Sequence, residues 1–160
     1  MEIRFAFPED VPQILCLLRQ TGQFYHSAKP DLFRVDAQKY SASQVLTMLN
    51  KPQTPVFVAV EENTVLGYCF CQIKTYYRDS MIVDHTSCHI EDLCVEESRC
   101  GTDVGKTLYE AVYRYAKERK CHSVTCNAYS CDRGAVKFWE AMGMTAQYVG
   151  MESLLEEDNA

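Results

Sequence analysis

The sequence contains no apolar run approaching the roughly 18 residues that a membrane-spanning helix needs. The opening residues Met1-Glu2-Ile3 do not lead into the basic and apolar regions of a secretory signal. We therefore expect a cytoplasmic protein that does not enter a membrane.

Positive charge is also in the minority, because 16 Lys and Arg residues face 22 Asp and Glu residues, for a net charge of -6. This balance argues against a nucleic-acid-binding surface. Only 7 Gly and 5 Pro occur in 160 residues, and 47% of the residues are hydrophobic, which excludes a disordered or collagen-like chain. The length suits one core, so we predict a single domain over residues 1-155 and a frayed acidic tail over 156-160.

The nine cysteines lack the paired CxxC spacing of a structural zinc site, and their number is odd. Cys69 and Cys71 alternate with aromatic residues in an apolar run, which is typical of small buried thiols. We predict no metal ion. A redox or metal module remains a weaker alternative, built on residues whose spacing fits no tetrahedral site: His85, Cys88, His89 and Cys94.

Hydrophobic periodicity predicts a mixed α/β fold. Alternating or β-rich runs predict strands over residues 3-7, 56-60, 65-73, 85-95, 123-128 and 145-153. Helical spacing predicts helices over residues 11-22, 43-49, 104-120 and a last helix ending at Gly143. The segment 24-40 mixes aromatic with charged residues, and we expect an irregular loop that lines a pocket.

The turn before the longest predicted helix has the composition of an anion site. Gly101 and Gly105 bracket Thr102 and Asp103, two residues that suit a helix N-cap. Backbone N–H groups at a helix N-terminus bind phosphate, and glycine permits a close approach. A glycine-containing turn before a helix is commonplace, so this spacing carries weight only together with its surroundings.

Four segments around that turn resemble the GCN5-related N-acetyltransferase (GNAT) family. They are the strand Ile90-Glu91-Asp92-Leu93-Cys94-Val95, the loop Cys100-Gly101-Thr102-Asp103-Val104-Gly105-Lys106-Thr107-Leu108, the strand Val124 to Asn127, and the helix and turn from Asp132 to Met144. The resemblance extends over about residues 1-152 and is specific over 91-143. It implies a mostly antiparallel sheet that splays between strands 4 and 5, with about four helices.

The resemblance also implies transfer of acetyl from acetyl-CoA to a primary amine of a small molecule or peptide, and it is compatible with a homodimer. The strand backbone would hold the pantetheine arm and the loop amides the pyrophosphate. The implied coenzyme-binding residues are Leu93, Cys94, Val95, Arg99, Cys100, Gly101, Thr102, Asp103, Val104, Gly105, Lys106, Thr107, Asp132 and Lys137.

Three residues depart from the family pattern. Cys100 stands where Arg or Gln is usual, and Arg99 would take over that role from one position earlier. Asp103 stands where the first loop glycine is usual, so it must point away, cap the helix or be offset by Arg99 and Lys106. Trp139 stands where many members place a Tyr that is proposed to protonate the departing thiolate.

Acetylation of an ammonium group needs a base to remove its proton, and a carboxylate with a raised pKa can serve. Glu91 and Asp92 lie on opposite faces of a regular strand, so at most one faces the cleft unless a bulge intervenes. We favour Glu91. The alternative for Asp92 is structural: it caps the splay or pairs with Arg99.

Two further residues complete the catalytic candidates. His89 shares the strand face of Glu91 and would act as base or relay, although an ordinary polar strand residue is the simpler interpretation. Tyr129 would replace the missing family acid, unless the thiolate leaves unassisted. Trp139 itself is expected in the core.

The acceptor pocket is expected to come from the variable aromatic segments. The predicted acceptor-binding residues are Phe24, His26, Phe33, Tyr76, Tyr77 and Tyr148. An alternative function of another class is a non-catalytic acyl-CoA sensor that keeps the fold, in which the departures at Cys100, Asp103 and Trp139 record lost chemistry.

Overall fold

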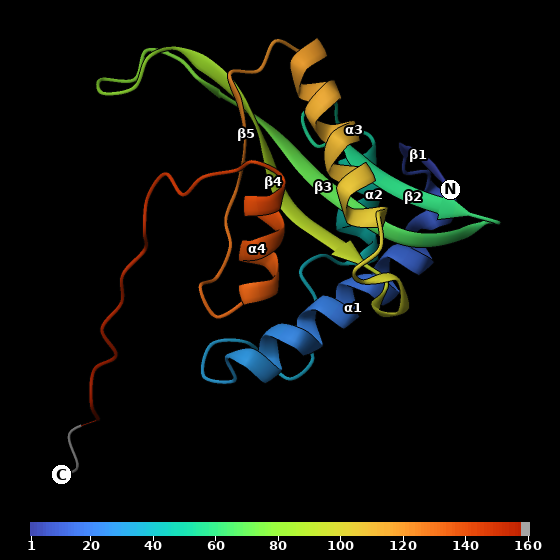
Figure 1. The fold of residues 1–160 in the computed structure, drawn as a ribbon, viewed down its shortest axis with the longest axis horizontal. Helices are drawn as coiled ribbons and strands as arrows, with labels where there is room; N and C mark the ends of the chain where they lie inside the picture. The colour runs from blue at the N-terminus through green and yellow to red at the C-terminus, as the bar shows by residue number, and fades with distance from the viewer. Residues whose placement is uncertain (158–160) are drawn as a thin grey trace.

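The computed structural model describes residues 1-157, which form one five-stranded sheet in the order β1-β2-β3-β4-β5 with helices on both faces (Figure 1). The strands are β1 (Glu2–Phe5), β2 (Val56–Glu61), β3 (Thr64–Tyr76), β4 (His85–Val95) and β5 (Ser123–Cys126). The α-helices are α1 (Val11–Ala28), α2 (Ala42–Leu49), α3 (Val104–Glu118) and α4 (Arg133–Ala141), and short 3-10 turns occupy Pro8–Asp10 and Glu97–Arg99. The first four strands are antiparallel, and only β4 and β5 run parallel.

The predicted hairpin between β2 and β3 is confirmed, and its turn is two residues long. Glu62 and Asn63 have φ values of 49° and 63°. Two successive positive φ angles are the mark of a type I′ turn, whose twist matches that of the flanking strands. The turn therefore sets the register in which β2 and β3 begin to pair, with Glu61 opposite Thr64.

Two apolar cores lie on the two faces of the sheet. Alternate β3 residues Tyr68 and Phe70 face α1 and α2, while Cys69 and Cys71 face α3. Leu108 and Val112 of α3 are fully buried against the second face. Every second side chain of β3 thus packs against the apolar face of α3, as the sequence pattern predicts.

Helix α1 does not end near Gly22 as predicted but continues to Ala28. A Cβ atom on Gly22 would lie 1.6 Å from the carbonyl oxygen of Ala37, so the glycine is needed for close contact with the loop beside the helix. Glycine here marks an approach of two backbones and not a helix end. Phe24 and His26 consequently lie on α1 and not in the predicted loop.

The predicted strand over residues 145-153 is wrong, because this segment pairs with no strand within residues 1-157. It leaves α4 after Gly143, whose φ of +85° closes the helix as predicted. Figure 1 shows the segment running away from the sheet and past α4. Of the predicted acidic tail, residues 158-160 lie outside the described residues.

All nine cysteines have free thiols, and Cys69, Cys71 and Cys88 are fully buried beneath α3. The hydrogen bond with Cys69 raises the pKa of the Cys71 thiol and the hydrogen bond with Cys71 raises that of the Cys88 thiol, and burial acts in the same direction on both. A thiol kept protonated is a poor nucleophile. These cysteines therefore act as small core residues, as the sequence pattern indicates.

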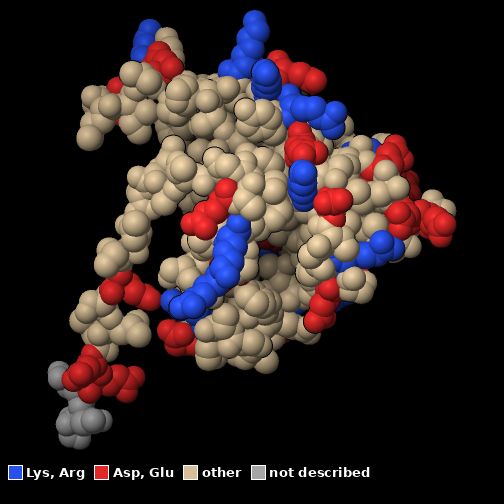
Figure 2. All heavy atoms as spheres, viewed as in Figure 1, with Lys and Arg blue, Asp and Glu red and all other residues tan. Residues whose placement is uncertain are grey.

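Acidic and basic side chains are interspersed over the face in Figure 2, and Lys and Arg gather at the upper edge over the end of α3. None of the helices in the described part of the chain is both long and apolar enough to span a bilayer.

Candidate active site

The sheet opens at the point where β4 and β5 part. Their parallel pairing runs from Ser87 opposite Ser123 to Ile90 opposite Cys126 and then stops. Strand β4 continues for five more residues to Val95, still paired with β3 on its other edge. Within residues 1-157 the β5-side edge of this stretch has no strand partner. An extended ligand can therefore lie along it.

A β-bulge at the opening changes which way the two carboxylates point. Phe70 pairs with Asp92, but the next β3 residue, Cys71, pairs with Ile90, so Glu91 is the extra residue of the bulge. Because of this insertion, Glu91 and Asp92 no longer lie on opposite faces. Both side chains contact groups on the side of the sheet that α1 and α2 cover.

Asp92 is the more enclosed of the two carboxylates. Its Oδ2 atom accepts a hydrogen bond from the Tyr68 hydroxyl at 2.7 Å. Burial raises the pKa of Asp92 above its ordinary value, although the Tyr68 hydrogen bond and the charge of Lys39 act in the opposite direction. Asp92 thus has the raised proton affinity that suits a general base.

Glu91 lies between two ammonium groups. Its carboxylate oxygens are 3.6 Å from the Lys74 Nζ atom and 4.0 Å from the Lys39 Nζ atom, and Lys39 also donates to the Glu91 carbonyl oxygen. These two ion pairs hold the Glu91 side chain in place at the edge of the opening. Among the described residues Asp92 has no contact with Arg99, so the predicted alternative of an Asp92–Arg99 pair is wrong.

His89 pairs with Thr125, one residue before the last pair between β4 and β5. Its Nδ1 atom is 2.8 Å from the Thr125 Oγ1 atom on β5. Burial and the nearby Lys74 lower the pKa of His89, so the ring is neutral at neutral pH. His89 therefore joins β4 to β5 just before they separate, and its neutral form leaves it able to accept a proton.

An aromatic cluster borders the opening on the side of α1. Tyr25 is 5.0 Å from Phe33 and 5.7 Å from Tyr129 between ring centroids, and Phe33 and Tyr129 are 5.4 Å apart. Phe24 packs edge-on against Tyr25. Burial, with the charges of Asp132 and Asp92, raises the pKa of Tyr25 to about 12. Tyr25 is therefore a neutral hydroxyl near two carboxylates.

The structure brings together only part of the predicted acceptor set. Phe24 and Phe33 belong to the aromatic cluster, and the His26 ring bonds to the Phe33 carbonyl at 2.7 Å and so holds that loop. Tyr148 donates to Asn127, just beyond β5.

Tyr76 and Tyr77 lie elsewhere, on the protruding β3–β4 hairpin (Figure 1). Tyr76 pairs and stacks with His85, six residues before Glu91, which corresponds to about 20 Å of extended strand. The prediction that Tyr76 and Tyr77 line the acceptor pocket is therefore wrong, because this length of β4 separates them from the sheet opening.

The start of α3 offers free backbone donors beside the opening. The N–H groups of Val104, Gly105 and Lys106 begin the helix, and no acceptor is found for them among residues 1-157. Such groups and the helix dipole favour an anion. Asp103 is the N-cap residue, but its exposed side chain makes no capping hydrogen bond. The structure thus excludes the alternative in which the Asp103 side chain caps α3.

Gly105 is required by packing. A Cβ atom there would lie 3.2 Å from the Phe138 ring of α4 and 3.4 Å from Val95. The glycine therefore lets the first turn of α3 lie directly against both β4 and α4. Gly101 has a φ of +79° with no atom near its absent side chain, so it serves the turn itself.

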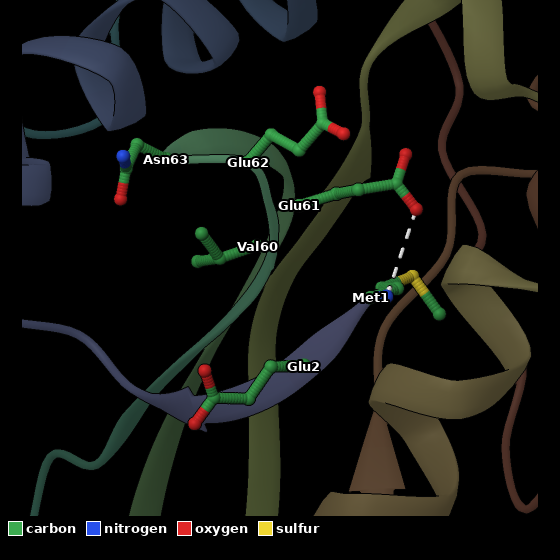
Figure 3. Close-up of a pocket in the computed structure, with 6 residues that line it drawn as sticks. All are labelled: Met1, Glu2, Val60, Glu61, Glu62 and Asn63. Atoms are coloured by element: carbon green, nitrogen blue, oxygen red, sulfur yellow. Dashed lines mark ion pairs between the residues drawn. The ribbon is translucent and has the colours of Figure 1, made fainter.

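Arg99 does not offset Asp103 in this structure. It donates to the Glu61 carboxylate at 3.0 Å, and Glu61 also lies 3.6 Å from the N-terminal ammonium of Met1 (Figure 3). Lys106 is 4.0 Å from Glu110 on its own helix. The pocket drawn in Figure 3 lies at the start of β1 and the β2–β3 turn, and Glu61, the partner of Arg99, is one of its lining residues.

Helix α4 packs against the start of α3, where Phe138 lies beside Gly105. Asp132 caps it by accepting from the Ala135 N–H at 3.0 Å, and Lys137 is exposed on its outer surface. Trp139 packs edge-on against Phe138 and Tyr109 of the α3-side core, which confirms its expected place.

The residues of the weaker metal alternative are split between the two faces of the sheet. Cys88 belongs to the core beneath α3, whereas Cys94 belongs to the core beneath α1. Nowhere in the described ranges do three or more His, Cys, Asp or Glu side chains gather as metal ligands.

Comparison with known proteins confirms the resemblance to the GNAT family. The profile of the Acetyltransferase (GNAT) family matches residues 20–144. The chain belongs to the GNAT acetyltransferase family. No curated protein sequence matches it.

Solved structures show that the GNAT fold extends over nearly the whole chain. A tetramutant of the BH1408 protein from Bacillus halodurans is 24% identical, with a TM-score of 0.92 over 97% of this chain and 100% of that one. An aminoglycoside acetyltransferase from an uncultured soil metagenomic sample, in complex with sisomicin, is 20% identical, with a TM-score of 0.73 over 97% and 96% of the two chains. Aminoglycoside N-acetyltransferase AAC(6')-Iy in complex with CoA is 15% identical, with a TM-score of 0.73 over 97% and 99%.

Several residues of the site were not predicted from the sequence. Tyr25, Tyr68 and Lys39 reach the two carboxylates from segments far away in the chain. Continuing the helical spacing past Gly22 would have placed Tyr25 on α1. Tyr68 and Lys39 carry no local signal, because their role depends on how β3 and the loop after α1 pack against β4.

Proposed function

We propose that this GNAT protein transfers acetyl from acetyl-CoA to a primary amine, with Asp92 as the general base. The observation that carries the proposal is the β4 bulge, which directs Asp92 and Glu91 to the same side at the point where β4 parts from β5. A base is thereby set beside an opening that an extended thioester can enter.

The chain's own groups fit a coenzyme of this type. The free N–H groups at the start of α3 suit a diphosphate, and the unpaired edge of β4 from Leu93 to Val95 suits an extended pantetheine arm. Acetyl-CoA, when bound, supplies the thioester carbonyl that the amine attacks. Arg99 would add a charged contact to the diphosphate once it leaves Glu61.

Asp92 is assigned as base in preference to Glu91, which the sequence favoured. Its raised pKa increases its affinity for a proton taken from the acceptor ammonium, directly or through water. Glu91 is held in ion pairs with Lys39 and Lys74. We assign Glu91 to holding those two lysines at the edge of the site.

The acceptor is proposed to be a cationic amine that binds over the aromatic cluster. Within the chain itself, the Lys29 ammonium lies 5.9 Å from the Tyr129 ring, which shows that the cluster accepts a cation over its face. The acidic net charge favours encounter with the same class of substrate. Tyr129, 44% exposed, is positioned to contact such an acceptor or to donate a proton to the departing thiolate.

The direct test is to incubate the purified protein with acetyl-CoA and a panel of primary amines that includes polyamines, aminoglycosides and short peptides, and to measure free thiol over time. Amine-dependent release of thiol is expected, with acetylated amine identified by mass. If acetyl-CoA raises the melting temperature but no amine releases thiol, the alternative of a non-catalytic acyl-CoA sensor is supported.

A further inference from the structure

Helix α1 carries two half-buried glutamines, Gln13 and Gln20, that each bind the backbone of another element. A spacing of i to i+7 places them on nearly the same face of the helix. The Gln13 amide donates to the Asn63 carbonyl oxygen at 3.1 Å and accepts from the Val65 N–H at 2.8 Å. It therefore fastens the β2–β3 turn to α1.

Gln20 makes the same pair of bonds at the end of β4. Its Nε2 atom donates to the Val95 carbonyl oxygen at 3.0 Å, and its Oε1 atom accepts from the Glu97 N–H at 3.2 Å. As with Gln13, one amide joins the carbonyl of one residue to the N–H of the second residue after it. These bonds fix the orientation of the amide, because a flipped amide would place a donor against the Glu97 N–H. We call the two bonds the Gln20 clamp.

The carbonyl held by the clamp belongs to the open edge of β4. Val95 stands opposite Gly67, and the bond beside this pair runs from the Glu96 N–H to the Leu66 carbonyl oxygen at 2.8 Å. Successive residues of a strand direct their backbone groups to opposite edges, so the N–H and carbonyl of Val95 point away from β3. These groups lie on the edge that suits a pantetheine arm.

The end of β4 has little else to fix it on this side. Within residues 1-157 the pairing of β5 stops at Cys126, opposite Ile90, and the chain leaves β4 after Val95 for the turn before α3. A strand end that is paired on one edge only opens readily. A ligand that binds such an end must also order it, which lowers affinity. The Gln20 clamp orders it before the coenzyme arrives.

We propose that Gln20 is a positioning residue for coenzyme binding, which holds residues 95-97 in the conformation that the pantetheine arm and the diphosphate loop require. The Val95 carbonyl oxygen has two lone pairs, so it can accept from Gln20 and from an N–H of the arm at the same time. Gln20 acts through the strand and not on the reacting atoms. This role rests on the coenzyme site of the proposed function.

The test compares Gln20→Met with Gln13→Met as its matched control. Methionine keeps the length of the side chain, and each variant loses the same two bonds between α1 and another element. We therefore expect similar decreases in melting temperature. Gln20→Met alone should weaken the binding of coenzyme A, measured by calorimetry, by about fivefold to tenfold. Gln13→Met should bind coenzyme A as the natural chain does.

Turnover separates positioning from stability and from chemistry. In Gln20→Met the KM for acetyl-CoA should rise by the same factor as the dissociation constant, while kcat at saturating acetyl-CoA and the KM for the amine stay at their natural values. A glutamine that only stabilised the fold would leave the KM for acetyl-CoA unchanged.

The outcomes distinguish this role from the proposed function. Coenzyme affinity that is unchanged in Gln20→Met, or lowered equally in Gln13→Met, would overturn the role of Gln20 and leave the proposed function standing. A fall in kcat without a change in the KM for acetyl-CoA would do the same. Failure of the natural chain to bind coenzyme A would overturn both.

The Glu97 N–H gives a second test that keeps Gln20 in place. Glu97 begins a 3-10 turn, a position that accepts proline, and Glu96 before it has a ψ of 136°, as a residue before proline requires. Glu97→Pro removes the N–H donor, whereas the control Glu97→Ala removes the same charge and keeps the donor. Glu97→Pro should bind coenzyme A more weakly than Glu97→Ala, and the difference should shrink in the Gln20→Met background. Equal affinities, or a difference that Gln20→Met leaves unchanged, would contradict the clamp.

Discussion

The coenzyme half of the candidate site, at the start of α3, offers mainly backbone groups, whereas the acceptor half, between α1 and the loop after β5, offers mainly side chains. The first half comes from the continuous stretch from Leu93 to Thr107. The second gathers Tyr25, Phe33 and Tyr129 from three places in the sequence. Backbone recognition tolerates substitution, except where a side chain would occupy the space, while side-chain recognition changes with each residue.

The largest expected effect is at Gly105, where the backbone half depends on an absent side chain. The variant Gly105→Glu should abolish the rise in melting temperature that coenzyme A produces, because the new side chain must displace Phe138 and Val95 from the helix start. Overpacking of this kind costs about 1 to 3 kcal/mol of folding stability.

Gly150→Ala is the matched control, since a Cβ atom there meets nothing within 4 Å. Should Gly105→Glu fold poorly, Gly105→Ala gives a milder form of the same change. Calorimetric binding of coenzyme A that is as tight to Gly105→Ala and Gly105→Glu as to the natural chain would remove the α3 start from the coenzyme site.

The next effect lies in the side-chain half. Asp92→Asn should lower kcat by about 100- to 10,000-fold while leaving the affinity for coenzyme A unchanged, because the amide cannot take up a proton. Glu91→Gln is the paired variant, and we expect a much smaller loss. A large loss in Glu91→Gln with near-normal turnover in Asp92→Asn would return the role of base to Glu91.

A smaller effect is expected from replacing Tyr68, and it tests the same assignment of Asp92 as the base. The proposed base must be ionised to take up a proton, so kcat/KM should fall as pH drops through the raised pKa of Asp92. Tyr68→Phe removes a hydrogen bond that stabilises the ionised form, so the pKa of Asp92 should rise further. The acid limb of the pH–rate profile should then move upward by about one pH unit.

Glu91→Gln provides the contrast, because removing a negative neighbour should lower the pKa of Asp92 and move the acid limb downward. Acid limbs that coincide in the natural chain and in Tyr68→Phe would show that some other group titrates.

The smallest effect concerns Arg99, the side chain that we propose to contact the diphosphate of the coenzyme. Glu61→Gln should free Arg99 and tighten coenzyme A binding about threefold, with the gain lost at high salt. Glu62→Gln is the control, because the structure gives Glu62 no ion pair with any residue up to 157. An equal gain for pantetheine, which lacks the diphosphate, would count against a role for Arg99 at the phosphates.

The sequence predicted the features that depend on neighbours along the chain. The helix α3, the hairpin of β2 and β3, the Gly143 helix end and the place of Trp139 follow from periodicity and turn chemistry. The end of α1 and the missing strand over 145-153 did not follow. The contact of Gly22 with Ala37 decided the first, whereas in the second the segment after α4 pairs with no strand within residues 1-157, although β5 has an open edge.

The candidate site divides in the same way. The loop from Arg99 to Thr107 was visible in the sequence, because backbone donors at a helix start are a local property. The sequence could not predict whether β4 contains a bulge, since a register shift depends on how β3 and β4 pair along their whole length. Its consequence, that Asp92 and Glu91 share one side, follows from that pairing alone.

By itself, then, the order of residues determined strands β1 to β5, the starts of the four helices and the family, because hydrogen bonding and apolar spacing within an element are short-range. The tertiary structure decided which carboxylate is enclosed by Tyr68, which cation holds Glu91, and where Arg99 rests. Burial and Coulomb interactions act through space and depend on distances that no local pattern encodes.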